Sequence, residues 1–462
     1  MWMEPAGSCT ELPCGTSCYK ITSMRTHLTL TASLASLVSV LLIGSAFPDQ
    51  QPARAGGDPA VLADAPSARI AAEFSSENRR ARKSQRKAAS PKKTPKRQPA
   101  AAPDKPTIPA RQEFNASQQE LAVIPGVPNA RFWADSPREF VQALPQTPGP
   151  WLVLSTGGED GAYGAGVLAG WSAAGTRPEF SVITGVSTGA LMAPFVFAGK
   201  KYDAHLKAAY TTVSAIDIFE VGGKGESLLD TWPLKELVAK QFTKELLDDI
   251  AREHARGRRL FILTTNLDAG RPVAWDIGAI ASKGDQQALE LVRMILMAAI
   301  SIPGAFPPVL IPAEAGTARF QEMHVDGGLG AQFYLAPDAL QMSSSSFTLP
   351  ATELYIIINM KLGNDFQVTE RSTLGILGRT VSAAIRVVAR NAIDRAYVLA
   401  TRSKVPFRLA LIDDAFTAPS RGPFDSDYMK ALFDFGFAQG KNGQAFRHEP
   451  PDFATRPTKA AR

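Results

Sequence analysis

Cysteine is nearly missing from this chain, and the few cysteines lie at one end. All three, Cys9, Cys14 and Cys18, come before residue 20 of a chain of 462 residues. The rest of the chain therefore cannot use disulfide bonds to hold a fold together, which excludes a disulfide framework. The apolar stretch that follows them also lacks a cysteine that could carry a lipid.

Metal ligands are sparse as well. The chain has five histidines, and its histidines, cysteines and carboxylates show none of the close spacings that zinc or calcium sites use. The adjacent acids Asp248 and Asp249 are typical of a solvated helix surface. We therefore predict that the protein binds no metal ion.

An even spread of basic charge is also lacking, although the net charge is +6. Between Glu77 and Arg111, twelve Lys or Arg stand against two acids, a local charge of +10, so the remainder carries about −4. Outside this segment nothing in the sequence indicates a nucleic-acid partner. We interpret the segment as a solvated linker that could touch anionic lipid, at about 1 kcal/mol per nearby Lys or Arg.

An uncharged apolar run of twenty residues lies at 28–47, after two basic residues and with small residues at its end. These are the parts of a secretory signal, in the usual proportions if translation begins at Met24. The alternative is an uncleaved membrane anchor, since a run of this length can also span a bilayer. Residues 1–47 are therefore a predicted leader, and we expect an exported or membrane-associated protein of the cell envelope rather than a cytoplasmic one.

Composition divides the rest of the chain. Residues 48–120 are rich in Pro, Ala, Lys, Arg and Ser without helical or strand periodicity, which predicts a disordered basic linker. From 121 to 450, apolar runs bounded by Gly or Pro alternate with helical patterns, which predicts one layered α/β domain. Residues 451–462 form a predicted polar tail.

The predicted elements of this domain are few but distinct. Six apolar runs are predicted strands, at 151–155, 180–184, 260–264, 323–325, 354–359 and 408–412. Four longer stretches are predicted helices, at 162–174, 233–256, 286–299 and 374–402. The last helix carries five arginines at near-helical spacing; a solvated or salt-bridged face is the default interpretation, and contact with lipid headgroups is the alternative.

The sharpest local motif is Gly-Val-Ser-Thr-Gly at 185–189, between an apolar strand and an apolar helical run. Gly185 and Gly189 permit a strained strand-to-helix turn that lifts the hydroxyl of Ser187 out of the backbone. The helix N-terminus beneath it favours developing negative charge. The alternative is a tight turn that simply needs two glycines.

A second glycine-rich turn follows the strand at 151–155. Gly157 and Gly158 leave backbone N–H groups unobstructed, and Gly161 stands at the start of the next helical run. Such a turn can hold an anion, which in an acyl hydrolase is the tetrahedral oxyanion. The alternatives are a phosphate site or a turn without a ligand.

A third motif is a short strand that delivers Asp326 at its end and then turns on Gly327 and Gly328. A carboxylate with an ordinary pKa near ~3.9 is ionised at neutral pH and could accept a proton from a serine. It would be a weak base unless it were partly desolvated. Taken alone, an Asp-Gly-Gly step is more often a simple turn than a catalytic feature.

These three motifs in this order resemble the patatin-like phospholipase family, from about residue 151 to 336 and more loosely to about 440. The resemblance implies a three-layer α/β/α fold with a mostly parallel central sheet. It also implies that Ser187 is the nucleophile, that Asp326 is its base, and that Gly157 and Gly158 supply oxyanion donors. The implied activity is hydrolysis of fatty acyl esters of phospholipids or neutral lipids, without a cofactor. Separately, we expect the protein to contact a membrane surface.

One departure from the family pattern bears on the second motif. The family loop commonly reads Gly-Gly-Gly-x-Arg-Gly, whereas Thr156 here replaces the first glycine and Asp160 stands where the basic residue would be. The backbone donors remain, but a positive charge near the developing anion is lost. Substrate preference and turnover therefore depend on what these two side chains do.

Two alternatives to a Ser-Asp dyad remain. A Ser-acid-His triad needs a histidine downstream of Ser187; His324 lies on the same strand face as Asp326, although a packed histidine is the commoner role, and His448 lies in the polar C-terminal part. The other alternative is an envelope-tethered binding or scaffold protein on a patatin-like fold with little or no catalysis. Protein partners are not indicated by the sequence.

Overall fold

The computed structural model describes residues 110–454, except 223–224, 343, 364–365 and 367. The predicted leader at 1–47, the linker up to residue 109 and the tail from residue 455 lie outside the described residues.

The packed part of the chain begins before the predicted linker ends. Helix α3 (Ala116–Glu120) is preceded by Phe114, which stacks on Phe320 with ring centroids 4.3 Å apart. Arg111 pairs with Asp268 at 2.7 Å. Composition alone does not reveal these partners, because they lie far away in the sequence.

A nine-stranded sheet forms the centre of the described part of the chain, in the order β1-β7-β6-β3-β2-β10-β11, with β9 pairing with β6 and β8 with β9. Strands β6, β3, β2, β10 and β11 run parallel, and the others are antiparallel. The sheet is therefore mostly parallel, as predicted. Its strands are β1 (Arg131–Trp133), β2 (Gly149–Leu154), β3 (Val182–Val186), β6 (Arg259–Asn266), β7 (Arg271–Asp276), β8 (Val309–Ala315), β9 (Ala318–Asp326), β10 (Ala351–Lys361) and β11 (Phe407–Ile412).

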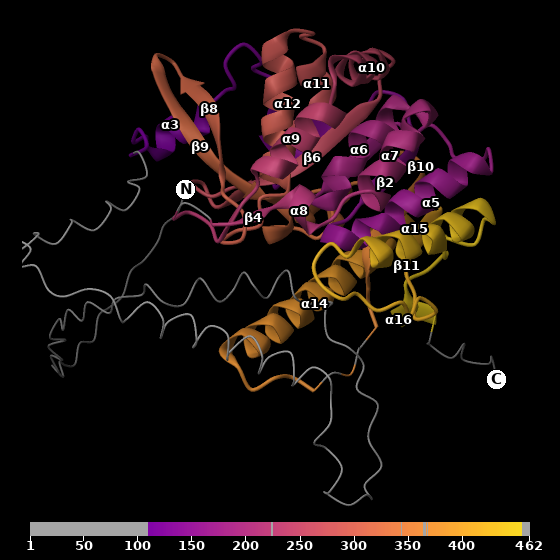
Figure 1. Cartoon of the computed structure of the whole chain (residues 1–462). Coiled ribbons are helices and arrows are strands. Elements are labelled where there is room, and N and C mark those ends of the chain that lie inside the picture. Colours follow the sequence, from indigo (N-terminus) through magenta and orange to yellow (C-terminus); the bar gives the residue numbers. More distant parts are fainter. Residues whose placement is uncertain (1–109, 223–224, 343, 364–365, 367, 455–462) are drawn as a thin grey trace, which may run out of the picture.

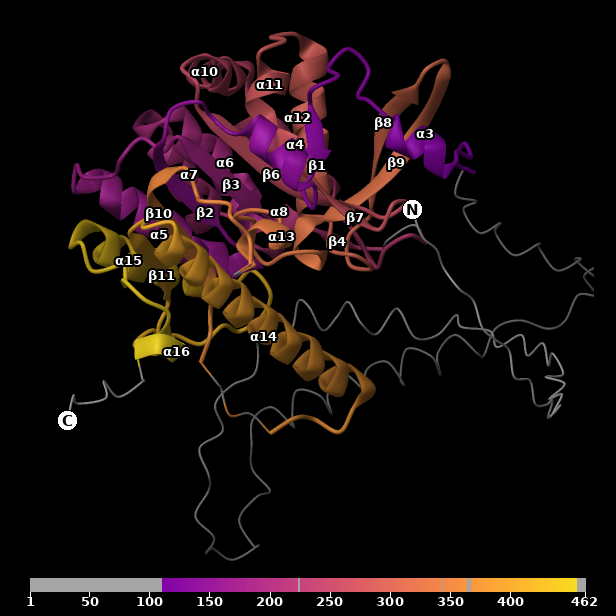
Figure 2. The same cartoon turned by 180° about the vertical axis from the view of Figure 1, so that it is seen from behind.

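Helices cover both faces of this sheet (Figures 1 and 2). The longer ones are α4 (Pro137–Ala143), α5 (Gly161–Ala173), α6 (Thr188–Ala198), α7 (Asp203–Thr211), α9 (Trp232–Gln241), α10 (Lys244–Ala255), α12 (Gln286–Ala299), α14 (Thr373–Arg402) and α15 (Ser426–Lys441). The short ones are α8 (Ala215–Ile218), α11 (Ile277–Ala281), α13 (Asp338–Gln341) and α16 (Pro451–Ala454). A small two-stranded ribbon, β4 (Glu220–Val221) and β5 (Leu229–Asp230), lies apart from the sheet.

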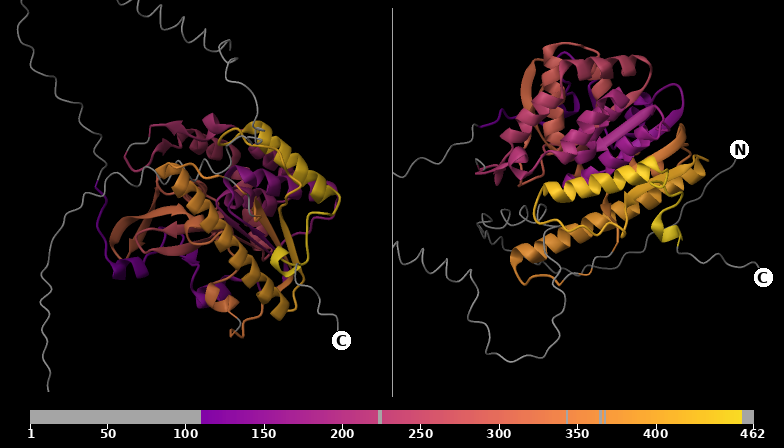
Figure 3. Two further views of the ribbon diagram at one scale, coloured as in Figure 1. Left: turned by 90° about the horizontal axis from the view of Figure 1, so that it is seen from below. Right: turned by 45° about the vertical axis from the view of Figure 1, so that its right-hand side comes forward.

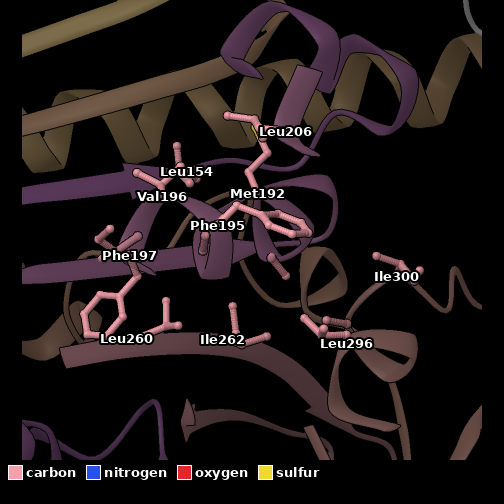
Figure 4. Packing of buried hydrophobic residues seen from close by; sticks show 14 of the residues in the cluster. Leu154, Met192, Phe195, Val196, Phe197, Leu206, Leu260, Ile262, Leu296 and Ile300 are labelled. Carbon is pink, nitrogen blue, oxygen red and sulfur yellow. The ribbon is translucent and has the colours of Figure 1, made fainter. Parts of the chain in front are cut away.

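Strand β2 contributes side chains to the cores beneath both helical layers. Its side chains alternate between the two faces, as an extended strand requires. Leu152 and Leu154 join the core beneath α5, α6, α12 and α15, whereas Trp151 and Val153 join the core beneath α4, α13 and α14. Figure 4 shows the first core, where side chains of α6 share a cluster with Leu154 and with Ile262 of β6. The fold is thus a three-layer α/β/α arrangement.

The predicted elements agree with the structure except in one helix. All six predicted strands are present, and α12 has the predicted bounds. The single helix predicted at 233–256 is wrong, because the chain forms α9 and α10 with a break at Phe242 and Thr243. Phe242 is buried, and the hydroxyl of Thr243 accepts a hydrogen bond from the backbone N–H of Leu246, which caps α10.

Helices α5 and α15 pack unusually closely, because glycines line their contact. A Cβ atom on Gly166 would lie 2.1 Å from the carbonyl oxygen of Phe433, and one on Gly170 would lie 2.1 Å from that of Phe437. Gly440 makes the reciprocal approach to the carbonyl of Val167, at 2.2 Å. This contact fixes the start of α15 relative to the start of α5.

Within the ranges that the structure describes, no helix is both long enough and apolar enough to cross a membrane.

Candidate active site

Ser187 lies at the turn between β3 and α6. Its backbone has φ 55° and ψ −124°, a conformation that costs energy in a residue with a side chain. Gly185 and Gly189 are required by close approach: added Cβ atoms would lie 2.5 Å from the carbonyl oxygen of Gly189 and 2.6 Å from that of Leu154, respectively. This is the strained strand-to-helix turn that the motif predicts.

The register of three strands brings Asp326 to this turn. Val186, the last residue of β3, pairs with Leu263 of β6. The next residue of β6, Thr264, pairs with Asp326 at the end of β9. The hydroxyl of Ser187 lies close enough to the Asp326 carboxylate to lower the pKa of that carboxyl. The two residues are separated by the intervening elements in the sequence and meet only through this register.

The Asp326 carboxylate is buried and has few partners. Its side chain also accepts a hydrogen bond of 2.7 Å from the backbone N–H of Gly328. Burial raises the pKa of Asp326 to about 7, against the lowering effect of the Gly328 backbone N–H and the Ser187 hydroxyl. Gly327 and Gly328 are needed for tight packing, since Cβ atoms there would lie 2.6 Å from the carbonyl oxygen of Leu263 and 2.8 Å from the Thr156 methyl group.

The two histidines considered for a triad are engaged elsewhere. His324 is fully buried; its Nδ1 lies 3.0 Å from the Thr264 hydroxyl and its Nε2 lies 3.3 Å from the Glu322 carboxylate. His448 contacts the guanidinium of Arg408 at 2.7 Å. Neither ring is presented to Ser187, and His324 takes the packed, hydrogen-bonded role.

The glycine loop after β2 leads toward the same serine. Gly157 has φ 157°, and a Cβ there would lie 2.2 Å from the carbonyl oxygen of Asn359; Gly158 has φ 56° and lines the pocket beside Ser187. A Cβ on Gly161 would lie 2.2 Å from the Thr188 hydroxyl, so this glycine lets α5 and α6 begin side by side. Each of the three predicted loop glycines thus has a positive φ or lies too close to a neighbouring atom to carry a side chain.

Asn359 holds the base of this loop and was not predicted as a site residue. It is fully buried at the end of β10. Its backbone N–H donates to the Ser155 hydroxyl at 2.8 Å, its amide donates to the Ser155 carbonyl, and its Oδ1 accepts from the backbone of Gly164. A polar residue after five apolar ones in β10 was the only sequence signal. Thr156 is held separately, by a 2.6 Å hydrogen bond from its hydroxyl to Gln332.

The two acids of the loop tie it to the beginning of α15. The phenol of Tyr428 donates to the Asp160 carboxylate at 2.5 Å, and burial raises the pKa of Asp160 to about 7. Glu159 accepts hydrogen bonds from the backbone N–H of Phe424 and from the hydroxyl of Ser420. Asp160 stands where the family commonly has a basic residue, and here it links the start of α5 to α15. The sequence did not predict this contact.

An apolar pocket of about 110 Å³ opens beside Ser187. Its walls come from several helices and from the loop before α15. They include Leu191 and Phe195 of α6, Leu234 and Val238 of α9, Leu296 of α12, Phe306 and Phe424. Its apolar lining suits a hydrocarbon chain.

Within the described ranges, no group of three or more His, Cys, Asp or Glu is placed to hold a metal ion. The expected absence of a metal and of a cofactor stays a prediction.

A serine on a strained turn after a central parallel strand, in a three-layer α/β fold, is the arrangement of α/β serine hydrolases. The comparisons with known proteins make the class more specific. The model of the patatin-like phospholipase family matches residues 152–336, so the chain contains a patatin-like phospholipase domain. This family supports hydrolysis of lipid acyl esters in general.

Other comparisons add little. Among solved structures, VipD from Legionella pneumophila aligns over 64% of this chain and 67% of its own, with 11% sequence identity and a TM-score of 0.34. No conclusion rests on that likeness. No curated protein sequence matches this chain.

Proposed function

We propose that the protein is a serine acyl hydrolase that cleaves fatty acyl esters of lipids through Ser187 and Asp326. The observation that carries the proposal is the register that brings the Ser187 hydroxyl beside the buried Asp326 carboxylate, at the edge of an apolar pocket. The family match supports the general class of reaction.

The first half-reaction forms an acyl-enzyme. Asp326 takes the proton of the Ser187 hydroxyl as the serine oxygen attacks the ester carbonyl carbon. The backbone N–H groups of Gly157 and Gly158 are the proposed donors to the resulting oxyanion, a role typically worth about 10² to 10³ in rate per donor. The carbon–oxygen bond to the alcohol then breaks, and the leaving alkoxide takes the proton from Asp326.

The second half-reaction releases the fatty acid. Asp326 removes a proton from water as the water oxygen attacks the acyl-enzyme carbonyl. Collapse of this intermediate breaks the bond to Ser187, and the serine oxygen recovers the proton from Asp326. A pKa of about 7 suits this repeated exchange, because a general acid–base group works best near the operating pH.

The proposed substrate is a lipid whose acyl chain enters the apolar pocket. Burial of each methylene there would contribute about 0.8 kcal/mol, so long chains should be preferred over short ones up to the depth of the pocket. We also propose, on the apolar run at 28–47, that the protein is exported or held at a membrane of the cell envelope.

The direct test is release of fatty acid by the full chain from a short-chain ester and from phospholipid vesicles. Ser187→Ala and Asp326→Asn should each lower kcat by at least about 10². Ser282→Ala, an exposed serine outside the site, is the matched control and should retain wild-type activity. Activity of Asp326→Asn at the wild-type level would refute the dyad.

The scaffold alternative predicts a different result. A protein without catalysis should neither release fatty acid nor react at Ser187 with a fluorophosphonate. Labelling that is abolished by Ser187→Ala but not by Ser282→Ala would exclude the scaffold reading. Inertness of the wild-type protein toward every ester and toward the fluorophosphonate would favour it.

A further inference from the structure

Helix α14 is longer than the sheet that it covers. Its buried residues begin at Ala389 and continue through Ile393, Ala396, Leu399 and Ala400. The packed part, 389–402, spans about 21 Å at 1.5 Å per residue, close to the roughly 20 Å of a six-residue strand such as β2. The preceding part, 373–388, is about 24 Å long and has no fully buried side chain among those described; near its end, Ile385 is partly buried against the second core. It projects away from the body of the molecule (Figures 1, 2 and 3).

The projecting half lies on the catalytic side of the sheet. Strands β2, β3, β10 and β11 are parallel and so end at one edge, the edge where Ser187 lies. Helix α14 follows β10 and therefore starts beyond that same edge. Helix α15 also starts there, and Phe424 before it and Met429 within it line the apolar pocket. Helices α14 and α15 lie on opposite faces of the sheet, and the right-hand view of Figure 3 shows both running from this end in roughly the same direction.

One side of the projecting half is apolar and exposed. Ile376 and Val387 are 53% and 56% exposed. They lie eleven positions apart with exposed Ala383 between them, which places all three on one line along the helix. Ala384 and Val388 are exposed beside this line. This apolar stripe is the group of five residues Ile376, Ala383, Ala384, Val387 and Val388.

A row of arginines borders the stripe. Arg379 and Arg386 stand seven positions apart in the projecting half, on one line next to the apolar one. Arg390 continues this line in the packed part, where its guanidinium donates to the carbonyl of Leu362. No Asp or Glu occurs between residues 371 and 393. The projecting half is therefore amphipathic in a particular way, with an apolar stripe beside a basic edge.

These features select one occupant for the surface. The basic segment between Glu77 and Arg111, with a local charge of +10, would be repelled by the arginine row. A second copy of the same helix would bring like charges together. An anionic lipid surface matches both the arginine row and the apolar stripe, because phosphates pair with arginine and the stripe enters the lipid interface.

We propose that the projecting half of α14 docks on an anionic lipid bilayer and so presents the pocket beside Ser187 to the surface. The exposed Phe366 and Val368, just before the helix, extend the apolar contact at its tip. This proposal rests on the proposed function, because docking would bring the lipid substrate to the pocket beside Ser187. The docking itself is measured without catalysis.

The experiment uses the full chain carrying Ser187→Ala, so that the vesicles are not consumed. Partition is measured by co-sedimentation with vesicles of phosphatidylglycerol and phosphatidylcholine, and with phosphatidylcholine alone. Ile376→Asp/Val387→Asp should weaken binding to both vesicles by at least about tenfold. Arg379→Gln/Arg386→Gln should weaken binding to the anionic vesicles by about 25-fold, at roughly fivefold per arginine, with little effect on phosphatidylcholine.

Matched controls separate this surface from the rest of the chain. Val141→Asp changes a 48% exposed valine on α4, and Arg319→Gln changes an arginine whose side chain is 86% exposed on the β8–β9 hairpin. Both should bind like the parent protein. Partition of the α14 variants equal to that of these controls would overturn the proposal, because the basic segment would then account for all binding.

Two further measurements separate lipid docking from the proposed function and from dimerisation. The α14 variants, with Ser187 restored, should hydrolyse a soluble short-chain ester within twofold of wild type. If wild type hydrolyses no ester but the vesicle losses hold, docking stands and the proposed function fails. Sedimentation that shows a dimer converted to a monomer by Val387→Asp would overturn lipid docking in favour of a second copy.

Discussion

In the proposed mechanism, the ionisation of Asp326 controls when Ser187 can lose its proton. Burial raises the pKa of this carboxyl to about 7, and only the ionised form can act as the base. We therefore predict that kcat/KM for a soluble ester rises with pH and levels off above a midpoint near 7. A pH profile measured between about 5 and 9 tests this. A flat profile over this range would show that the titrating base is another group.

The same burial makes Asp326 a destabilising residue at neutral pH. Its folded pKa, about 7, lies above the ordinary value of 3.8, so the folded state binds the proton more tightly than the unfolded state. The resulting stabilisation is complete below about pH 4 and is lost as pH rises to about 7. Asp326→Asn should therefore raise the Tm at pH 8 by at least about 2 °C and have less effect at pH 4. Thermal unfolding at both values measures it, and a lower Tm at pH 8 would contradict it.

The contact between Asp160 and Tyr428 positions the glycine loop. Tyr428→Phe removes the hydrogen bond that the phenol donates to this buried carboxyl, and an unpartnered buried group costs about 1–3 kcal/mol. We predict a loss of stability of that size together with a lower kcat for a soluble ester, because the loop carries the proposed oxyanion donors. Asp160→Asn in the same background should recover part of the stability, since an amide is cheaper to bury.

A matched control for this pair is available. Tyr355 also donates to a carboxylate, that of Glu353 at 2.8 Å, but near the beginning of β10, at the opposite end from the site. Tyr355→Phe should leave kcat unchanged. Equal losses of kcat in the two variants would show that Tyr428 acts through general stability rather than through the loop.

The close contact between α5 and α15 leaves no room for a side chain at Gly166. Gly166→Ala would place a methyl group 2.1 Å from the carbonyl oxygen of Phe433, so the two helices must separate. We expect a loss of stability of about 1–3 kcal/mol, as overpacking usually costs. Because α15 carries Tyr428 and Met429, kcat/KM should fall as well. Urea unfolding and ester hydrolysis measure the two effects.

The control for this substitution is Gly330→Ala, because a Cβ there meets its nearest atoms at 3.7 Å, an ordinary contact distance. Its stability should stay within about 0.5 kcal/mol of wild type. A Gly166→Ala protein as stable as Gly330→Ala would mean that the helices can shift apart without penalty.

Hydrophobic runs predicted the central elements better than the peripheral ones. The parallel strands are buried on both faces, so β2, β6 and β10 appear as continuous apolar runs. Strand β7 begins with Arg271 and Pro272 and was not predicted, although it pairs with β6 along its whole length. The break between α9 and α10 was missed because the helical pattern continues on both sides of it.

The position of the whole protein in the cell depends on the apolar run at 28–47, which lies outside the described residues. We predict that cells expressing the full chain place it outside the cytoplasm or on a membrane. Cell fractionation and N-terminal sequencing of the product test this. A new N-terminus just after Ala46 would support a signal peptide, and an intact N-terminus in the membrane fraction would support an anchor. An intact chain in the soluble cytoplasmic fraction would contradict both.

The sequence by itself determined the layered α/β fold, the strained turn at Ser187 and the candidate carboxylate at Asp326. It could do so because glycines at tight turns and apolar runs leave local signals. The dyad and the oxyanion role of the loop stay predictions until activity is measured.

Only the tertiary structure decided which side chains meet. The register of β3, β6 and β9 brings Asp326 to Ser187, and burial, which no local pattern specifies, moves its pKa toward neutrality. The link from Asp160 to Tyr428 and the projection of α14 beyond the sheet likewise depend on the packing of distant segments. Contacts between residues far apart in the chain leave no periodicity in the sequence, and for that reason they had to be seen in three dimensions.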